Sequence, residues 1–397
     1  MRMSRRSFIR STVAGASGIV VGVQAFGAAG QTSLDGTKKI TRKLGRTGLE
    51  LPVVSMGVMR SDNPALVRAA LQKGFVHFDT AHGYQNGKNE EMLGEVFQNV
   101  PRKSIIIGTK VQPEDRNRMT GVIGPNSTSK AFLARLETSL RRLRTDYVDI
   151  LYVHAVSSRP GVLHPEMLEA VTAAKAAGKA RFVGVSTHKN EPEVIRAAVE
   201  SGLYDVVLTA VNFKQDHYAE VKTAMAEAVA AGVGLVGMKT MAGGFLDKEK
   251  TKPINCRAAL KFVLQDPHLC TTIPGISSFD QLDDNAAVNE DIALTEQEKA
   301  DLEQASLQGG LYCQGCEHCA KGCSRGLPIP DLMRAYMYAY GYGSTRDART
   351  VLEGHGITGS PCENCDTCGA ECVKGFTVRD RIADVARISG LPAEFLA

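Results

Sequence analysis

Eight of the chain's ten cysteines fall in two copies of one spacing near its carboxyl end. The two copies are Cys313, Cys316, Cys319 and Cys323, followed by Cys362, Cys365, Cys368 and Cys372. Each copy is a C-x2-C-x2-C-x3-C run, the spacing of the thiolate ligands of [4Fe-4S] clusters. Three thiolates of such a run bind one cluster, and the fourth commonly binds the cluster of the other run. We therefore predict two [4Fe-4S] clusters with exchanged fourth ligands.

Zinc and disulfides are the alternative uses of these eight cysteines. Zinc sites use separated C-x2-C pairs rather than one dense run of four cysteines. Disulfides form in exported proteins, but cysteines three residues apart in a tight loop pair poorly. The two cysteines outside the runs, Cys256 and Cys270, are interpreted as small buried apolar side chains.

A second group of chemically capable side chains lies in the first half of the sequence. Asp79, Lys110 and His154 each end an apolar, strand-like run, and Tyr84 follows Asp79 by five residues. A lone carboxylate at a strand end is usually a cap, and a lone lysine is usually solvated. Four such groups at the ends of three successive strands instead predict one site for proton transfer and for stabilising charge on oxygen.

The elements that must position these side chains repeat one unit, an apolar strand followed by a helical pattern. The predicted strands are residues 53–59, 76–80, 105–111, 148–154, 181–186, 206–211, 235–240 and 271–276. Eight units over about 240 residues predict an α/β fold, a (β/α)8 TIM barrel of residues 38–300, with a short hairpin at 40–52 before it. A doubly wound open sheet is the alternative, although no glycine-rich phosphate turn follows the first strand.

Each cysteine run is followed by an amphipathic helical pattern. Leu332, Tyr336 and Tyr340 recur every four residues after the first run, and an apolar stripe begins at Val378 after the second. We interpret these stripes as packing faces. The segment 305–397 is similar to a helical ferredoxin, which implies a small, mostly helical second domain with two [4Fe-4S] clusters between its helices.

Residues 40–289 resemble the aldo/keto reductase superfamily. The sequence FDTAHGYQNGKNEEMLG at 78–94 is similar to the family's first signature. The sequences LETSL at 136–140 and TDYVD at 145–149 are similar to its second. The resemblance implies reduction of a carbonyl, or the reverse oxidation of an alcohol, with hydride exchanged with a nicotinamide.

The same resemblance implies a role for each of the four polar residues. Tyr84 would donate the proton to the carbonyl oxygen, and the Lys110 cation would bring the pKa of this phenol down toward neutrality. Asp79 would keep Lys110 charged and oriented. His154 would orient the carbonyl oxygen and stabilise its developing charge.

The resemblance also implies nicotinamide contacts at the ends of the later strands. The candidates are Ser186, Asn212, Pro274, Gly275, Ser277, Gln281 and Asn285. Residues 273–285 contain no Lys or Arg to pair with the 2′-phosphate of NADP, which leaves the choice between NADP and NAD open. Lys239 is interpreted either as the source of that missing charge or as a solvated loop lysine.

Residues 1–30 have the pattern of an export signal. Arg5 and Arg6 precede Phe8 in a basic start, and residues 11–34 carry no charged side chain and many small ones. This pattern predicts a Tat signal peptide and a periplasmic or otherwise exported protein that meets the membrane only during export. An uncleaved anchor is the alternative. The net charge of +4 is scattered along the chain and does not favour nucleic-acid binding.

These features together predict an exported oxidoreductase that acts on a small carbonyl or alcohol and passes electrons through its clusters to an exported partner. Hydride carries two electrons whereas a cubane cluster takes one, and no flavin site is recognisable in the sequence. An electron-transfer or scaffold protein whose barrel does not turn over is therefore the alternative. A third interpretation is an ordinary reductase whose clusters are purely structural.

Overall fold

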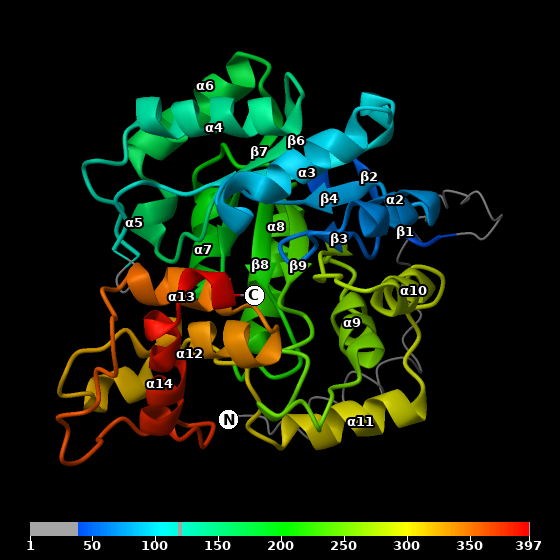
Figure 1. Cartoon of the computed structure of the whole chain (residues 1–397). Coiled ribbons are helices and arrows are strands. Elements are labelled where there is room, and N and C mark those ends of the chain that lie inside the picture. The colour runs from blue at the N-terminus through cyan, green and yellow to red at the C-terminus, as the bar shows by residue number, and fades with distance from the viewer. Residues whose placement is uncertain (1–38, 118–120, 397) are drawn as a thin grey trace.

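Eight parallel strands form the centre of the molecule, which a computed structural model describes for residues 39–117 and 121–396 (Figure 1). The strands are β3 (Met56–Gly57), β4 (His77–Asp79), β5 (Ile106–Val111), β6 (Val148–Val153), β7 (Ala180–Thr187), β8 (Val206–Ala210), β9 (Gly234–Met238) and β10 (Thr271–Thr272). They pair in sequence order, and bridges from Val54 to Thr272 and from Gly57 to Gly275 join the last strand to the first. The sheet is therefore closed, so the predicted (β/α)8 barrel is confirmed and the open-sheet alternative is wrong.

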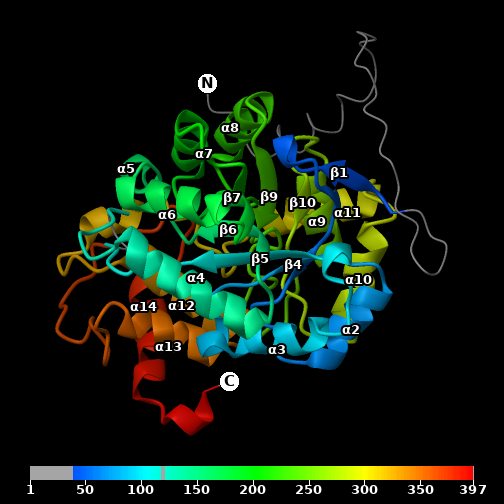
Figure 2. The same ribbon diagram turned by 90° about the horizontal axis from the view of Figure 1, so that it is seen from above.

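Helices surround the barrel, as the view turned by 90° shows (Figure 2). They are α2 (Pro64–Gln72), α3 (Lys88–Phe97), α4 (Ser129–Leu143), α5 (Arg159–Val162), α6 (Pro165–Ala176), α7 (Glu191–Glu200), α8 (Tyr218–Ala230), α9 (Cys256–Leu264), α10 (Phe279–Val288) and α11 (Glu296–Ser306). Asn63, Thr128, Asn255 and Ser278 fix the starts of four helices, because each side chain accepts a hydrogen bond from a backbone N–H of the first turn.

Burial on both faces explains why the strands read as unbroken apolar runs. All six residues of β6 are buried. Ile150 and Tyr152 belong to the cluster inside the barrel, whereas Leu151 and Val153 belong to the cluster beneath the helices. Side chains alternate between the faces of a strand, so a strand covered on both faces needs apolar residues at nearly every position.

A hairpin of β1 (Thr41–Lys43) and β2 (Glu50–Pro52) packs against the interior of the barrel, at the position predicted from sequence. Leu44, Leu49 and Leu51 join the same buried cluster as Ile150 and other inward-facing strand residues. The turn approaches β9 closely, because a Cβ on Gly45 would lie 2.4 Å from the backbone nitrogen of Gly234.

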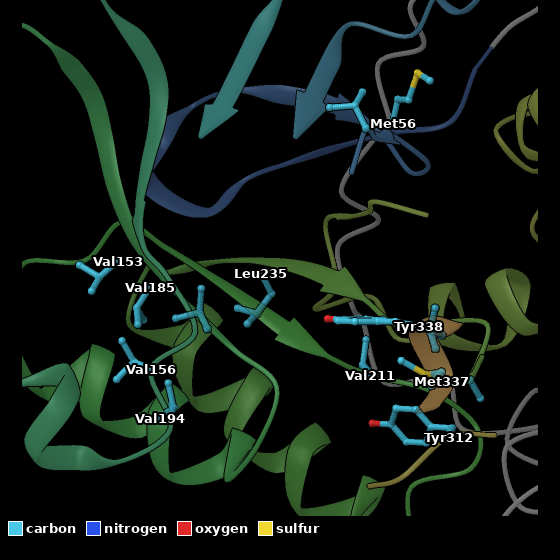
Figure 3. Packing of buried hydrophobic residues seen from close by; sticks show 14 of the residues in the cluster. Met56, Val153, Val156, Val185, Val194, Val211, Leu235, Tyr312, Met337 and Tyr338 are labelled. Carbon is cyan, nitrogen blue, oxygen red and sulfur yellow. The ribbon is translucent and has the colours of Figure 1, made fainter. Parts of the chain in front are cut away.

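In the described part of the segment after α11, the regular elements are short helices, and the rest is loop. The segment contains α12 (Ile329–Tyr336), a single π turn (Met337–Gly341), α13 (Thr345–Glu353) and α14 (Val378–Ala386). The first cysteine run lies between α11 and α12, with Cys319 in a 3-10 turn (His318–Gly322), and the second run lies between α13 and α14. One buried apolar cluster continues from the barrel into this segment. Figure 3 shows Tyr312, Met337 and Tyr338 beside Val211, the residue after β8. An ion pair of 2.7 Å between Lys248 and Asp384 also joins the two regions.

The predicted export signal at residues 1–30 lies outside the described residues. Within the described ranges, no helix has both the length and the apolar character needed to cross a membrane.

We expect Leu51→Ala to lower the free energy of unfolding by about 2–5 kcal/mol, because Leu51 is fully buried inside the barrel and its removal leaves a cavity. Urea unfolding followed by far-UV circular dichroism measures this loss. Leu203→Ala is the control, since Leu203 is 39% exposed. Equal effects of the two substitutions would contradict a packing role for the hairpin.

Candidate active site

Lys110 is the centre of the polar group predicted at the strand ends. It lies in β5, and its ammonium donates hydrogen bonds to Asp79 Oδ1, at the end of β4, and to the Thr80 carbonyl oxygen at 2.6 Å. The Tyr84 hydroxyl lies 3.4 Å from Lys110 Nζ. The His154 ring meets the Tyr84 ring edge-on, with centroids 6.0 Å apart. The structure thus brings all four predicted side chains together.

Parallel strand pairing determines this arrangement. Asp79 pairs with Gly108 across β4 and β5, and Lys110 pairs with Tyr152 across β5 and β6. The backbone N–H of His154 donates to the Val111 carbonyl at 2.9 Å, which extends the ladder by one residue. The polar groups therefore share one end of the barrel, where the carboxyl ends of the strands meet.

Burial raises the pKa of the Tyr84 phenol well above its usual value, and the nearby Asp79 and Tyr338 act in the same direction. The expectation that Lys110 lowers this pKa toward neutrality is therefore wrong for the structure described. The physical reason is that the Lys110 cation is matched by Asp79. Burial lowers the pKa of Lys110 and raises that of Asp79, while their mutual attraction opposes both shifts. Tyr84 is thus a protonated phenol, the form that a proton donor requires.

A cavity of about 300 Å³ connects these groups with the predicted nicotinamide segment. Tyr84 and His154 line one part of it, and Gln281 and Asn285 line another, with Pro274 and Gly275 also in its wall. Ser277 is placed beside the cavity, since its hydroxyl donates to Gln281 Oε1 at 3.1 Å.

Ser186 and Asn212 are fully buried and do not belong to the cavity wall that the described residues form. Ser186 Oγ accepts a hydrogen bond of 2.8 Å from the N–H of Ala155, and so holds the backbone directly after His154. Asn212 Oδ1 accepts one of 3.0 Å from the N–H of Lys214, and the Tyr312 phenol lies beside this amide.

Several residues of the cavity were not found from the sequence. They are Arg60, His188, Cys256, Arg257, Tyr338 and Tyr342. Arg257 lines the same cavity as Gln281 and Asn285 and pairs with Asp284 at 2.9 Å. Cys270 is buried as expected, but Cys256 is half-buried in the cavity wall, and burial raises the pKa of its thiol to about 11.

The structure argues against one of the two interpretations of Lys239 made from the sequence. Its ammonium lies inside the cavity, 4.7 Å from the ring centroid of Tyr338 and 5.1 Å from that of Tyr342. It is therefore not a solvated loop lysine. It lines the same cavity as Gln281 and Asn285, so its role as a source of charge for a 2′-phosphate stays a prediction.

The eight clustered cysteines are free thiols in two spatial sets. Cys313 interacts electrostatically with Cys316, Cys319 and Cys372, and Cys362 interacts with Cys365, Cys368 and Cys323. Each set therefore combines three cysteines of one run with the fourth of the other. In the part of the chain described, no three His, Cys, Asp or Glu side chains lie close enough to hold one metal ion.

The two cysteine loops touch through their backbones. A Cβ on Gly322, in the first run, would lie 1.9 Å from the carbonyl oxygen of Gly369 in the second. A side chain at position 322 would therefore push the loops apart. This contact places the two cysteine sets next to each other.

Residues 55–258, just over half of the chain, match the aldo/keto reductase family, and the protein belongs to this family. L-galactose dehydrogenase from Arabidopsis thaliana is 26% identical over 313 residues, which cover 68% of this chain and 93% of that protein. L-glyceraldehyde 3-phosphate reductase from Escherichia coli is 32% identical over 163 residues, covering 38% of this chain and 46% of the relative.

Solved structures are similar to the barrel. Aldo-keto reductase AKR11C1 from Bacillus halodurans, in its holo form, aligns with a TM-score of 0.54 at 23% identity, and covers 67% of this chain and 96% of its own. The thermostable aldo-keto reductase Tm1743 aligns with a TM-score of 0.52 over 67% of this chain and 99% of its own, also at 23% identity. These likenesses support the barrel fold.

We expect Tyr84 to contribute no tyrosinate absorbance up to about pH 10, because a phenol with a raised pKa keeps its proton until the pH exceeds that value. The difference spectrum between the wild type and Tyr84→Phe isolates this one phenol among the ten tyrosines. A tyrosinate band that appears below about pH 9 in the wild type and is absent from Tyr84→Phe would contradict this expectation. It would show that Lys110 lowers the pKa of Tyr84 by more than burial raises it.

Proposed function

We propose that the protein is an exported aldo/keto reductase that exchanges hydride between a nicotinamide and a small carbonyl or alcohol. We further propose that it carries two [4Fe-4S] clusters, which pass electrons to or from an exported partner. The observation that carries the enzymatic part is the buried Lys110, which links Asp79 to Tyr84 beside His154 at the mouth of the barrel.

The residues present suit the reduction of a carbonyl. Tyr84, protonated and buried, donates its proton to the carbonyl oxygen as the charge on that oxygen develops. Lys110 stabilises the phenolate that remains, and Asp79 keeps Lys110 in place. The His154 ring lies beside the phenol, where it orients the carbonyl oxygen.

The cavity also fits a nicotinamide cofactor, which supplies the hydride when bound. Pro274, Gly275, Gln281 and Asn285 line the part of the cavity that would hold it. Arg257 offers a cation for a 2′-phosphate, but its pairing with Asp284 does not by itself favour NADP over NAD.

The two cysteine sets support two [4Fe-4S] clusters. Each thiolate of a cubane binds a different iron, so its four ligands lie further apart than the ligands of one ion. The interacting charges of four cysteines in each set suit a [4Fe-4S] cluster, in which each of four thiolates binds one iron. The exchange of Cys323 and Cys372 between the sets also agrees with the arrangement common in two-cluster proteins.

Export by the Tat route rests on Arg5, Arg6 and the uncharged stretch at residues 11–34. The route accepts folded proteins, which suits a chain whose cofactors must be inserted before export. The nicotinamide would then travel as a bound cofactor.

Tyr84→Phe tests the enzymatic proposal, and we expect turnover of a carbonyl substrate to fall by about a hundredfold or more because the proton donor is lost. Anaerobic titration with NADPH and then NADH, followed by cluster absorbance, tests the coupling. Bleaching by either nucleotide supports a coupled enzyme. Reduction by dithionite alone, with no turnover by the wild type, would favour the electron-transfer or scaffold alternative.

Paired cysteine substitutions test the exchange of fourth ligands. Cys316→Ala with Cys372→Ala removes two ligands from one set, so we expect iron content to fall from about eight to about four atoms per chain. Cys316→Ala with Cys323→Ala damages both sets and should lose more iron. Cys270→Ala is the control. A larger loss of iron from Cys316→Ala with Cys372→Ala than from Cys316→Ala with Cys323→Ala would contradict the exchange of fourth ligands.

A further inference from the structure

The wall of the cavity carries a lysine, Lys239, with no ion-pair partner among the described residues. Lys239 directly follows β9 in a left-handed backbone conformation, with a φ of 58°. Such strain in a residue other than glycine is concentrated at functional sites. Among the described residues Lys239 forms no ion pair. Its ammonium lies against the rings of Tyr338 and Tyr342 and 3.5 Å from the Tyr338 hydroxyl, and it also interacts with the Tyr342 side chain and, electrostatically, with Asp347.

The two tyrosines form a roof that comes from the cysteine-rich part of the chain. Tyr338 belongs to the π turn after α12, and Tyr342 follows that turn. Their rings are stacked with centroids 5.8 Å apart. The Arg60 guanidinium lies 5.3 Å from the Tyr342 ring and lines the same cavity. The roof therefore lies over the same cavity that contains Tyr84 and His154.

The surroundings of Lys239 have a surplus of positive charge. Burial lowers the pKa of His188 well below its usual value, and the positive charges of Lys239 and Arg334, together with His154, lower it further. His188 Nδ1 is buried without a hydrogen-bond partner.

Among the described residues, no carboxylate near this wall forms an ion pair with Lys239. Asp79 forms an ion pair with Lys110. Asp331 forms ion pairs with Arg334 and, at 2.8 Å, with His355. The remaining carboxylate, Asp347, has its pKa raised by burial and faces both Lys239 and Arg60.

We propose that Lys239 binds an anionic group of the substrate beneath the roof formed by Tyr338 and Tyr342. This inference rests on the proposed function. The substrate class is then a small carbonyl compound that carries a carboxylate or a phosphate. Its carbonyl lies between Tyr84 and His154, and its anionic group lies on Lys239.

Charge compensation favours this assignment. A buried ammonium that has no carboxylate within ion-pair distance loses hydration, and an anionic ligand would supply a charge-assisted hydrogen bond. The position also agrees with a substrate rather than an adenosine phosphate. Lys239 acts electrostatically on Lys110, so it lies near the reacting groups.

Kinetics on matched aldehydes tests the assignment. We compare succinic semialdehyde with butanal, and glyceraldehyde 3-phosphate with glyceraldehyde, using the full chain with its iron–sulfur clusters. In Lys239→Met we expect kcat/KM to fall at least about thirtyfold for the anionic aldehydes, through KM, and to change little for the neutral ones. Lys239→Arg should restore the preference, and the exposed Lys252→Met is the matched control. The pair with the larger loss identifies carboxylate or phosphate.

Calorimetric binding of succinate and 2-phosphoglycolate separates this inference from the proposed function, because neither anion is reduced. If no aldehyde turns over, loss of anion binding in Lys239→Met still supports the anion site. Equal anion binding by the wild type and Lys239→Met would overturn it. A Lys239→Met variant that weakens NADPH binding but keeps the preference for anionic aldehydes would also overturn it, and would assign Lys239 to the cofactor.

Discussion

The ion pair between Lys110 and Asp79 is the constraint around which the candidate site is built. Both side chains are almost wholly buried, at 1% and 2% exposure. Two charges withdrawn from water are expensive unless their geometry is good and their remaining hydrogen-bonding groups are satisfied. Lys110 is satisfied by Asp79, the Thr80 carbonyl and Tyr84, which come from one strand end and the loop after it, whereas Asp79 Oδ2 is buried with no hydrogen-bond partner among the described residues. Register between β4 and β5 therefore determines where the phenol can lie.

The elements of the barrel could be predicted because their physical causes act locally. A strand buried on both faces must be apolar along its length, as β6 is, and a polar residue directly after such a run lies at the rim. This reasoning found Asp79, Lys110 and His154. The helical stripe after each cysteine run was likewise visible, because amphipathic periodicity needs only a few turns of sequence.

The remaining features of the site depend on contacts between distant segments. Lys239 is separated from Tyr338 by 99 residues, and no periodicity in the sequence indicates that they meet. The stripe of Tyr336 and Tyr340 was visible as a packing face, but the cavity receives Tyr338 and Tyr342, which lie between and beyond them. The pKa of Tyr84 was misjudged for the same reason. The pKa of Tyr84 is shifted upward because groups from several elements bury the phenol, and the spacing of residues in the sequence does not reveal that burial.

The roof over the cavity also determines when the cavity can be completed. Tyr338 and Tyr342 come some fifty residues after the predicted nicotinamide segment at 273–285, so a ribosome delivers the barrel before it delivers the roof. Domains generally fold as units during synthesis, with amino-terminal parts first. A newly made barrel is therefore open at its carboxyl-terminal rim until α12 and the π turn dock on it. A molecule that enters during that interval meets the cavity before Tyr338 and Tyr342 form part of its wall. The order of the segments along the chain thus makes the roof the last part of the cavity wall to be built.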